Sequence, residues 1–172
     1  FGADGYEVLP IIISPERKKQ LNNNLLMFFT GFTRFSSEVQ KANVTSSPID
    51  KKAMLKTMYG LVNEAEEVLV NKERNLDDFG RLLDITWKLK RQTGRAVSTN
   101  SIDRLYMRGI EAGALGGKLL GAGGGGFLVL YVQPDKQEEV RAAMSDLMYI
   151  PFEFEDAGTQ VIYYTPETYK PV

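Results

Sequence analysis

Apolar residues recur at intervals of three and four along several segments, which is the spacing of one face of an α-helix. Each segment starts at a helix-capping pattern such as Ser47-Pro48-Ile49-Asp50, with a hydroxyl, a proline and an acid. We expect helices after Ser14, Ser47, Asn75, Asn100 and Gln133, with Gly94 ending the third. The expected inward positions are Met54, Met58, Leu61, Val62, Ala65, Val68, Leu69, Phe79, Leu82, Leu83, Thr86, Trp87, Ile102, Leu105, Tyr106, Gly109, Ile110, Val140, Met144, Leu147 and Met148.

Short continuous apolar runs predict buried strands. They cover residues 6–13, 25–30 and 127–132, and shorter strand patterns follow at residues 151–154 and 160–164. The resulting order of elements lacks a regular βαβ alternation. It predicts an α+β fold with an antiparallel or mixed sheet and helices packed on one side.

The composition restricts the chemistry that the chain can perform. A length of 172 residues suits one compact domain, and a net charge of −1 gives no reason to expect a nucleic acid or membrane partner. Without cysteine or histidine there are no disulfides, thiolate zinc sites or imidazole-based triads. Carboxylates, lysines, arginines, hydroxyls and backbone N–H groups remain. No signal peptide or membrane span is evident, so we expect a cytoplasmic protein.

Half of the 16 glycines lie in the segment 113–127. Its Gly121–Gly126 portion matches G-x-G-x-x-G, but a dinucleotide site needs a strand before the motif and a helix after it. We expect the reverse order here, a helix before the loop and a strand after it. A Walker motif would need glycine at Ala112 and a hydroxyl residue at Leu119, so it is excluded. A structural turn would explain one or two glycines, whereas consecutive unshielded N–H groups favour an anion-binding active-site loop.

The segment Gly113-Ala-Leu-Gly-Gly-Lys-Leu-Leu-Gly-Ala-Gly-Gly-Gly-Gly-Phe127 resembles the third glycine motif of the GHMP kinases, specifically the branch acting on heptose phosphates and fucose. Residues 25–34, 97–103 and 151–154 are similar to other segments of that branch. The resemblance implies that residues 1–172 form the C-terminal domain of a sugar kinase, a ferredoxin-like α/β sandwich with an added helical layer. It also implies ATP and Mg²⁺ as cofactors, bound mainly by an N-terminal domain.

By the same resemblance, Ala122, Gly123, Gly124 and Gly125 lie near the phosphoryl acceptor and the ATP loop of the N-terminal domain. The Gly-x-Gly-Ser-Ser loop of that domain and its catalytic aspartate do not occur in this sequence. We therefore interpret the chain as a piece of a longer kinase and expect it to be inactive alone. The alternative is a stand-alone binding or regulatory domain that kept the fold and lost catalysis.

Two basic residues are further candidates for phosphate contacts. Arg34 follows a glycine turn at a strand end, and its guanidinium could grip a substrate phosphate through two hydrogen bonds. Lys118 could contact phosphate, or simply cover a helix end. A local basic cluster near the end of the third expected helix could hold a sugar phosphate, but such a cluster is more often a solvated helix face; it comprises Lys88, Lys90, Arg91 and Arg95.

Overall fold

A computed structural model describes residues 5, 8, 10–32, 48–94, 97–121, 125–156 and 163, with the side chains of the second helix described from Lys52 onward. A four-stranded antiparallel sheet has the strand order β2-β3-β1-β4. Its strands are β1 (Leu25–Phe29), β2 (Gly116–Leu120), β3 (Phe127–Tyr131) and β4 (Met148–Tyr149). The helices are α1 (Pro15–Asn23), α3 (Pro48–Val70), α4 (Asp77–Gln92), α5 (Asn100–Glu111) and α6 (Gln137–Ala143), and the 3₁₀ turn η2 (Pro134–Lys136) precedes α6.

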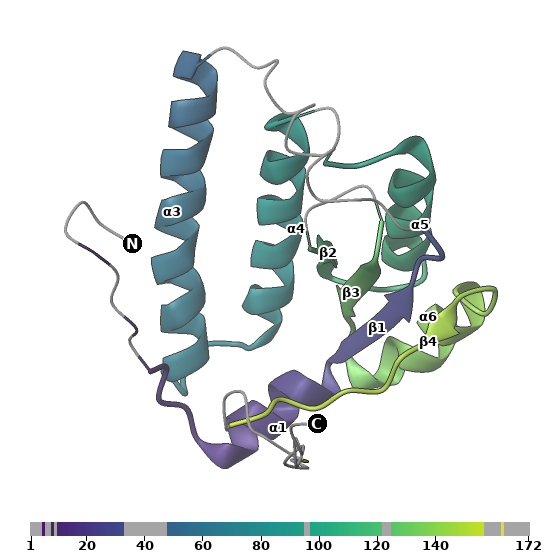
Figure 1. Cartoon of the computed structure of the whole chain (residues 1–172). Coiled ribbons are helices and arrows are strands. Elements are labelled where there is room, and N and C mark those ends of the chain that lie inside the picture. Colours follow the sequence, from purple (N-terminus) through teal and green to yellow (C-terminus); the bar gives the residue numbers. More distant parts are fainter. Residues whose placement is uncertain are drawn as a thin grey trace, which may run out of the picture.

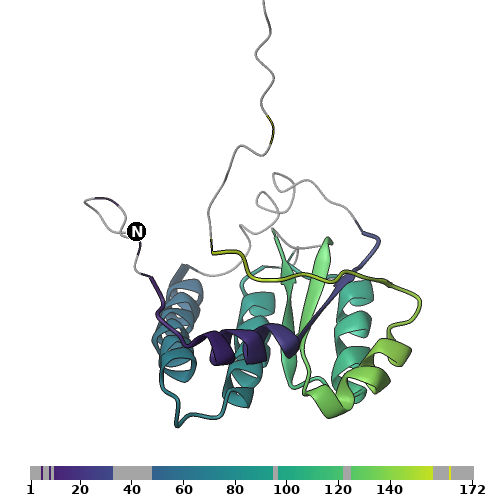
Figure 2. The same cartoon turned by 90° about the horizontal axis from the view of Figure 1, so that it is seen from below.

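Helices cover both faces of the sheet, with α3 and α4 on one side and α5 and α6 on the other (Figure 1, Figure 2). Alternate residues of β1 and β3 enter two separate cores because successive side chains of a strand point to opposite faces. Leu26 and Leu130 pack with the α5 and α6 side, whereas Leu25 and Tyr131 pack with the α3 and α4 side. The α+β class is confirmed, but the prediction that helices pack on one side is wrong.

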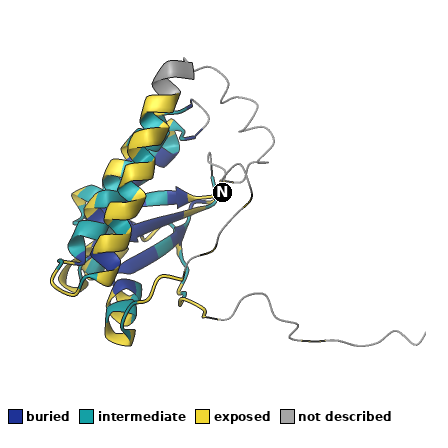
Figure 3. Cartoon of the chain, turned by 90° about the vertical axis from the view of Figure 1, so that its left-hand side faces the viewer, coloured by how far each residue is buried: buried dark blue, intermediate teal, exposed yellow. Residues whose placement is uncertain are grey.

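The capping patterns predicted the long helices well. Helix α3 begins at Pro48 as expected, and Asn75 accepts a hydrogen bond from the N–H of Asp77 at 2.9 Å where α4 begins. At α5 the cap is Thr99 rather than Asn100, since the N–H of Ile102 donates to the Thr99 hydroxyl at 3.3 Å. Figure 3 shows largely buried strands behind α3, whose outer face is exposed.

Several shorter predictions fail. The described residues among 6–13 form no strand, and neither do residues 151–154, because the last strand pairs earlier, at Met148–Tyr149. The segment 160–164 lies outside the described residues apart from Tyr163, which is not in a strand. Helix α6 ends at Ala143, so Met148 is 66% exposed rather than inward; Val62 on α3 is also exposed.

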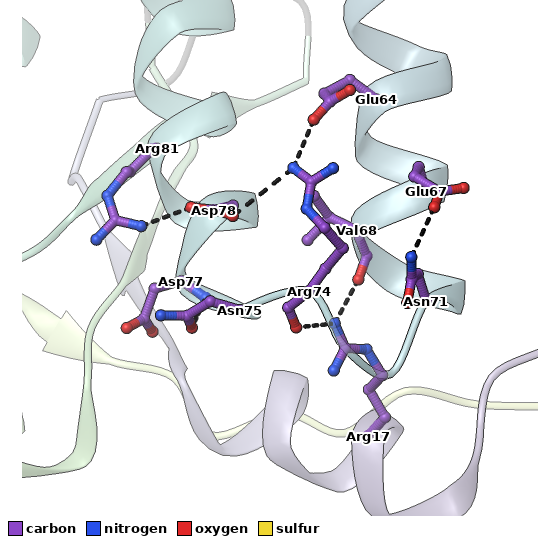
Figure 4. Close-up of polar contacts among 10 residues, drawn as sticks. All are labelled: Arg17, Glu64, Glu67, Val68, Asn71, Arg74, Asn75, Asp77, Asp78 and Arg81. Atoms are coloured by element: carbon purple, nitrogen blue, oxygen red, sulfur yellow. Dashed lines mark hydrogen bonds and ion pairs between the residues drawn. The ribbon is translucent and has the colours of Figure 1, made fainter.

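Arg17 of α1 joins α1 to the connection between α3 and α4 (Figure 4). Its guanidinium donates to the carbonyl oxygens of Leu69 at 2.8 Å, of Arg74 at 3.0 Å and of Val68. The last carbonyls of a helix have no partner within the helix, so this side chain caps α3. In the described part of the chain, no helix combines the length and hydropathy that a membrane span requires.

Candidate functional site

The glycine segment forms a β-hairpin, not the loop between a helix and a strand that the sequence predicted. Residues 116–120 are strand β2, and β3 pairs with it in antiparallel orientation, with Lys118 opposite Val129. Thus a strand precedes the loop, which the sequence did not predict. The dinucleotide and Walker motifs remain excluded, because both require a helix after the loop.

Most glycines of the segment have a structural cause. A Cβ at Gly116 would collide with the carbonyl oxygen of Gly80 on α4 and would lie 2.8 Å from the backbone nitrogen of Asp84. Gly121 and Gly126 have φ of +91° and +105°, values that other residues rarely adopt. Close packing or positive φ therefore accounts for more glycines than the one or two expected; they are Gly113, Gly116, Gly117, Gly121, Gly125 and Gly126.

The hairpin turn is held against the segment that follows β1. The N–H of Gly126 donates to the Phe32 carbonyl at 2.8 Å, and the N–H and hydroxyl of Thr30 donate to the Gly126 carbonyl at 2.9 and 2.8 Å. A Cβ at Gly125 would lie 2.7 Å from the carbonyl carbon of Phe32. The structure therefore places the glycine motif beside the Thr30-Gly31-Phe32 turn, two segments that are far apart in the sequence.

Of the predicted site residues, Gly125 and Lys118 lie in the described part of the chain. Ala122, Gly123, Gly124 and Arg34 lie outside it. Arg34 comes two residues after Phe32 in the sequence, and the three loop residues directly precede Gly125. In the sequence, these four predicted residues are therefore close to Phe32 and Gly125, the two described residues that meet at the junction.

Lys118 lies in the middle of β2, so it does not cover the end of the preceding helix, which ends at Glu111. Like Gly116 two positions earlier, it is on the strand face that contacts α4. Burial lowers the pKa of Lys90 on α4, and the positive charge of Lys118 lowers it further. Within the described residues neither lysine has a carboxylate in an ion pair.

The rest of the basic cluster is largely neutralised. Lys88 pairs with Asp84 at 2.6 Å and Arg91 pairs with Asp103 at 2.7 Å, while Arg95 lies outside the described residues. This agrees with the interpretation as a solvated helix face. Asp84 also accepts a 2.7 Å hydrogen bond from the buried hydroxyl of Tyr106; burial and this bond raise the tyrosine pKa.

A cavity of about 440 Å³ was missed by the sequence analysis. It lies between the end of β1, one face of α5 and the segment after α6, and its polar lining comprises Thr30, Ser101, Arg104, Arg108 and Asp146. Arg104 and Arg108 are four apart on α5, and that spacing was the available signal, since it places both side chains on one helix face. The sequence could not predict that Thr30, which is far away in the chain, lines the same cavity.

The described residues offer no group of three or more acidic side chains that could hold a metal ion. Carboxylates, together with substrate phosphates, are the ligands that Mg²⁺ uses in phosphoryl-transfer sites. The acidic side chains of the described residues therefore form no cluster that could hold Mg²⁺ by itself.

The family model for the C-terminal domain of GHMP kinases matches residues 65–150, half of the chain. The chain belongs to this family. The match begins within α3 and ends just after β4, so it includes the glycine hairpin and both helical layers.

Three curated relatives are kinases. The chain is 26% identical over 160 residues to the D-glycero-alpha-D-manno-heptose 7-phosphate kinase of Campylobacter jejuni, covering 87% of the chain and 46% of the relative. It is 29% identical over 150 residues to a bifunctional fucokinase/GDP-fucose pyrophosphorylase of Arabidopsis thaliana (81% and 13%). It is 32% identical over 145 residues to the mevalonate kinase of Thermococcus sibiricus (81% and 40%).

Solved structures show the same fold. The mevalonate kinase of Methanococcus jannaschii superposes with a TM-score of 0.65 at 25% identity, over 80% of this chain and 42% of that one. The chain thus spans less than half the length of the relatives and the structure described. Together the matches identify it as a GHMP kinase C-terminal domain with homologues that act as kinases.

Proposed function

We propose that this chain is the C-terminal domain of an ATP-dependent kinase that phosphorylates a sugar or sugar phosphate, with a heptose phosphate as the favoured acceptor. The observation that supports this most directly is the junction of the glycine hairpin with the Thr30–Phe32 turn, held by hydrogen bonds of 2.8 to 2.9 Å. Phosphoryl transfer depends on positioning and charge stabilisation, which unshielded backbone N–H groups of a glycine segment can supply.

Each predicted residue has a role in this proposal. Ala122, Gly123, Gly124 and Gly125 form the wall that approaches the transferred phosphate, because glycines leave their backbone N–H groups unshielded. Arg34 contacts a phosphate on the acceptor. Lys118 contributes positive charge from β2.

ATP and Mg²⁺ are assigned mainly to an N-terminal kinase domain, the proposed partner of this chain. The magnesium ion would neutralise charge on the nucleotide phosphates. This chain's own part is to exclude water and to position the acceptor against the glycine turn. We place the whole protein in the cytoplasm and expect the 172 residues alone to be inactive.

Mevalonate is the second candidate acceptor, favoured by the 32% identity to the archaeal mevalonate kinase. The heptose phosphate kinase aligns over more of the chain, 87% against 81%, which supports the sugar phosphate. A stand-alone domain without catalysis remains the alternative from another functional class.

The test is ATP-dependent phosphorylation by the full-length protein, assayed with heptose 7-phosphate, fucose and mevalonate. We expect the highest kcat/KM with the heptose phosphate. Arg34→Ala should raise the KM for the heptose phosphate and leave the KM for ATP unchanged. Phosphorylation of none of the three acceptors would contradict the kinase proposal and favour the non-catalytic domain.

Gly125→Ala tests the hairpin junction in the same assay. The added methyl group would meet the Phe32 backbone and displace the turn, so we expect turnover to fall about tenfold or more. Gly60→Ala is the matched control, because a Cβ there has open space on α3 and should leave turnover unchanged. Equal turnover of the two variants would remove Gly125 from the site.

A further inference from the structure

The cavity beside α5 lies next to Thr30 and Phe32, the residues that contact the glycine hairpin. Its two arginines, Arg104 and Arg108, have no role in the function proposed above. Its volume of about 440 Å³ falls within the range of about 300–1,000 Å³ that is typical of small-molecule sites. Phe32, Leu105 and Leu147 contribute apolar lining, while Thr30 and Ser101 contribute hydroxyl groups. Such a combination of an apolar surface with a few polar groups suits a small polar ligand with a carbon skeleton.

The two arginines are not equally neutralised. Arg108 pairs with Asp146 through contacts of 2.7 and 3.2 Å, but its Nε–H group is buried and donates to no acceptor among the described residues. Arg104 donates to the hydroxyl of Ser101 at 3.3 Å and forms no ion pair in the described part of the chain. With two guanidinium groups against one carboxylate, the lining carries a net positive charge.

We propose that this cavity binds a phosphorylated polyol, with Arg104 as a ligand of its phosphate group and Arg108 beside it. A guanidinium is suited to this role because it offers planar pairs of N–H donors to phosphate oxygens. Asp146 and the two hydroxyl residues provide hydrogen-bond partners for the polyol hydroxyls. The proposal rests on the proposed function, since it names the place where a phosphorylated acceptor binds.

The position of the cavity explains how such a ligand would meet the reaction centre. Thr30 and Phe32 line the cavity, and the same two residues hold Gly126 through hydrogen bonds of 2.8 to 2.9 Å. A ligand with its phosphate at Arg104 would therefore extend its carbon chain toward the glycine hairpin. The hydroxyl to be phosphorylated is then distant from the phosphate that is already present.

The test is equilibrium binding by calorimetry at low salt, without ATP, so that it does not depend on catalysis. The probes are D-mannose 6-phosphate, D-mannose and inorganic phosphate, measured on the full-length protein. We expect mannose 6-phosphate to bind more tightly than either of the other two. Arg104→Gln should weaken its binding about tenfold, the usual size of one charged hydrogen bond.

Two further variants make the result specific. Asp146→Asn removes the negative charge that competes for Arg108, so it should tighten binding of mannose 6-phosphate; the residue is 61% exposed and the fold should tolerate the change. Arg81→Gln removes an exposed, ion-paired arginine of α4 outside the cavity and should leave binding unchanged. Circular dichroism confirms that each variant is folded.

The proposal is overturned if mannose 6-phosphate does not bind, if Arg104→Gln binds it normally, or if Arg81→Gln loses as much affinity. The kinase assay is independent of these binding measurements. If the protein phosphorylates its acceptor but one of these three binding results is obtained, the acceptor binds outside this cavity. Conversely, binding that depends on Arg104 in a protein without kinase activity would support the cavity and contradict the proposed function.

Discussion

Gly116 of β2 lies directly against the carbonyl oxygen of Gly80 on α4. Both residues lack a side chain at the contact, which allows the strand to approach the helix backbone. On its other side, Gly80 lies against the Tyr131 ring, where a Cβ would come within 2.6 Å of Cδ1. The two glycines thus set the distance between α4 and the sheet.

Gly116→Ala should therefore destabilise the fold. The added methyl group must displace either α4 or β2, and overpacking of this kind costs about 1–3 kcal/mol. Gly60→Ala on α3 is the control; it has open space and should stabilise the helix by about 0.5–1 kcal/mol. Urea unfolding followed by circular dichroism measures both. Equal stability of Gly116→Ala and the wild type would contradict the close contact.

The buried hydroxyl of Tyr131 should make the free energy of unfolding depend on pH in the alkaline range. Burial raises its pKa to about 12; the nearby Asp77 carboxylate also raises it, while the hydrogen bond from Asn24 opposes the shift. The unfolded chain releases this proton near pH 10, so stability should fall between about pH 10 and pH 12 by roughly 2–3 kcal/mol. Urea unfolding across this range should show a shallower fall for Tyr131→Phe, and an identical slope would refute this origin.

The variant Lys118→Met tests whether Lys118 has a structural role, through its effect on Lys90, or a functional role as a phosphate contact. Since the charge of Lys118 and burial both lower the pKa of Lys90, the variant should raise that pKa and stabilise the fold at neutral pH. The gain should vanish above the ordinary lysine pKa, where the unfolded chain is also neutral. NMR titration of the lysine side chains and urea unfolding measure these effects.

The kinetics of the same variant decide the role of Lys118. A phosphate contact predicts a rise of about tenfold in the KM for ATP in the full-length protein, the effect of one lost charged hydrogen bond. Lys19→Met, an exposed position on α1, is the control. A stabilised variant with unchanged KM would make Lys118 a structural residue.

Local signals predicted the long elements because they depend on adjacent residues. The proline and acid at the start of α3 and the spacing of its apolar positions are sufficient to predict the helix. Strand β2 was missed because Gly116-Gly-Lys-Leu-Leu120 has little strand propensity of its own. Its packing against Gly80 explains it, and that contact is not visible in the sequence. Likewise β4 is short and is defined only by pairing with β1.

The candidate site divides in the same way. The glycine motif was recognised from a continuous segment, and Arg34 was inferred from its place after a glycine turn. The cavity was missed because it forms only when Arg104 on α5 comes beside Thr30 after β1. Charged residues with a spacing of four are common on exposed helix faces, so spacing alone could not distinguish this pair.

Arg17 provides a test of how the helical layer is attached to the sheet. It donates to carbonyl groups at the end of α3 and in the connection to α4, which no other residue type can do in the same geometry (Figure 4). We expect Arg17→Ala to lower the free energy of unfolding by about 2 kcal/mol, as for the loss of charged hydrogen bonds.

Arg17→Lys distinguishes this geometry from charge alone. A lysine keeps the positive charge but cannot present the planar fork of donors, so it should recover less than half of the loss. Lys19→Ala, at an exposed position of the same helix, should leave stability within about 0.5 kcal/mol of the wild type. Urea unfolding compares the three variants. Full recovery by lysine would mean that charge near the end of α3, rather than the three-carbonyl contact, provides the stabilisation.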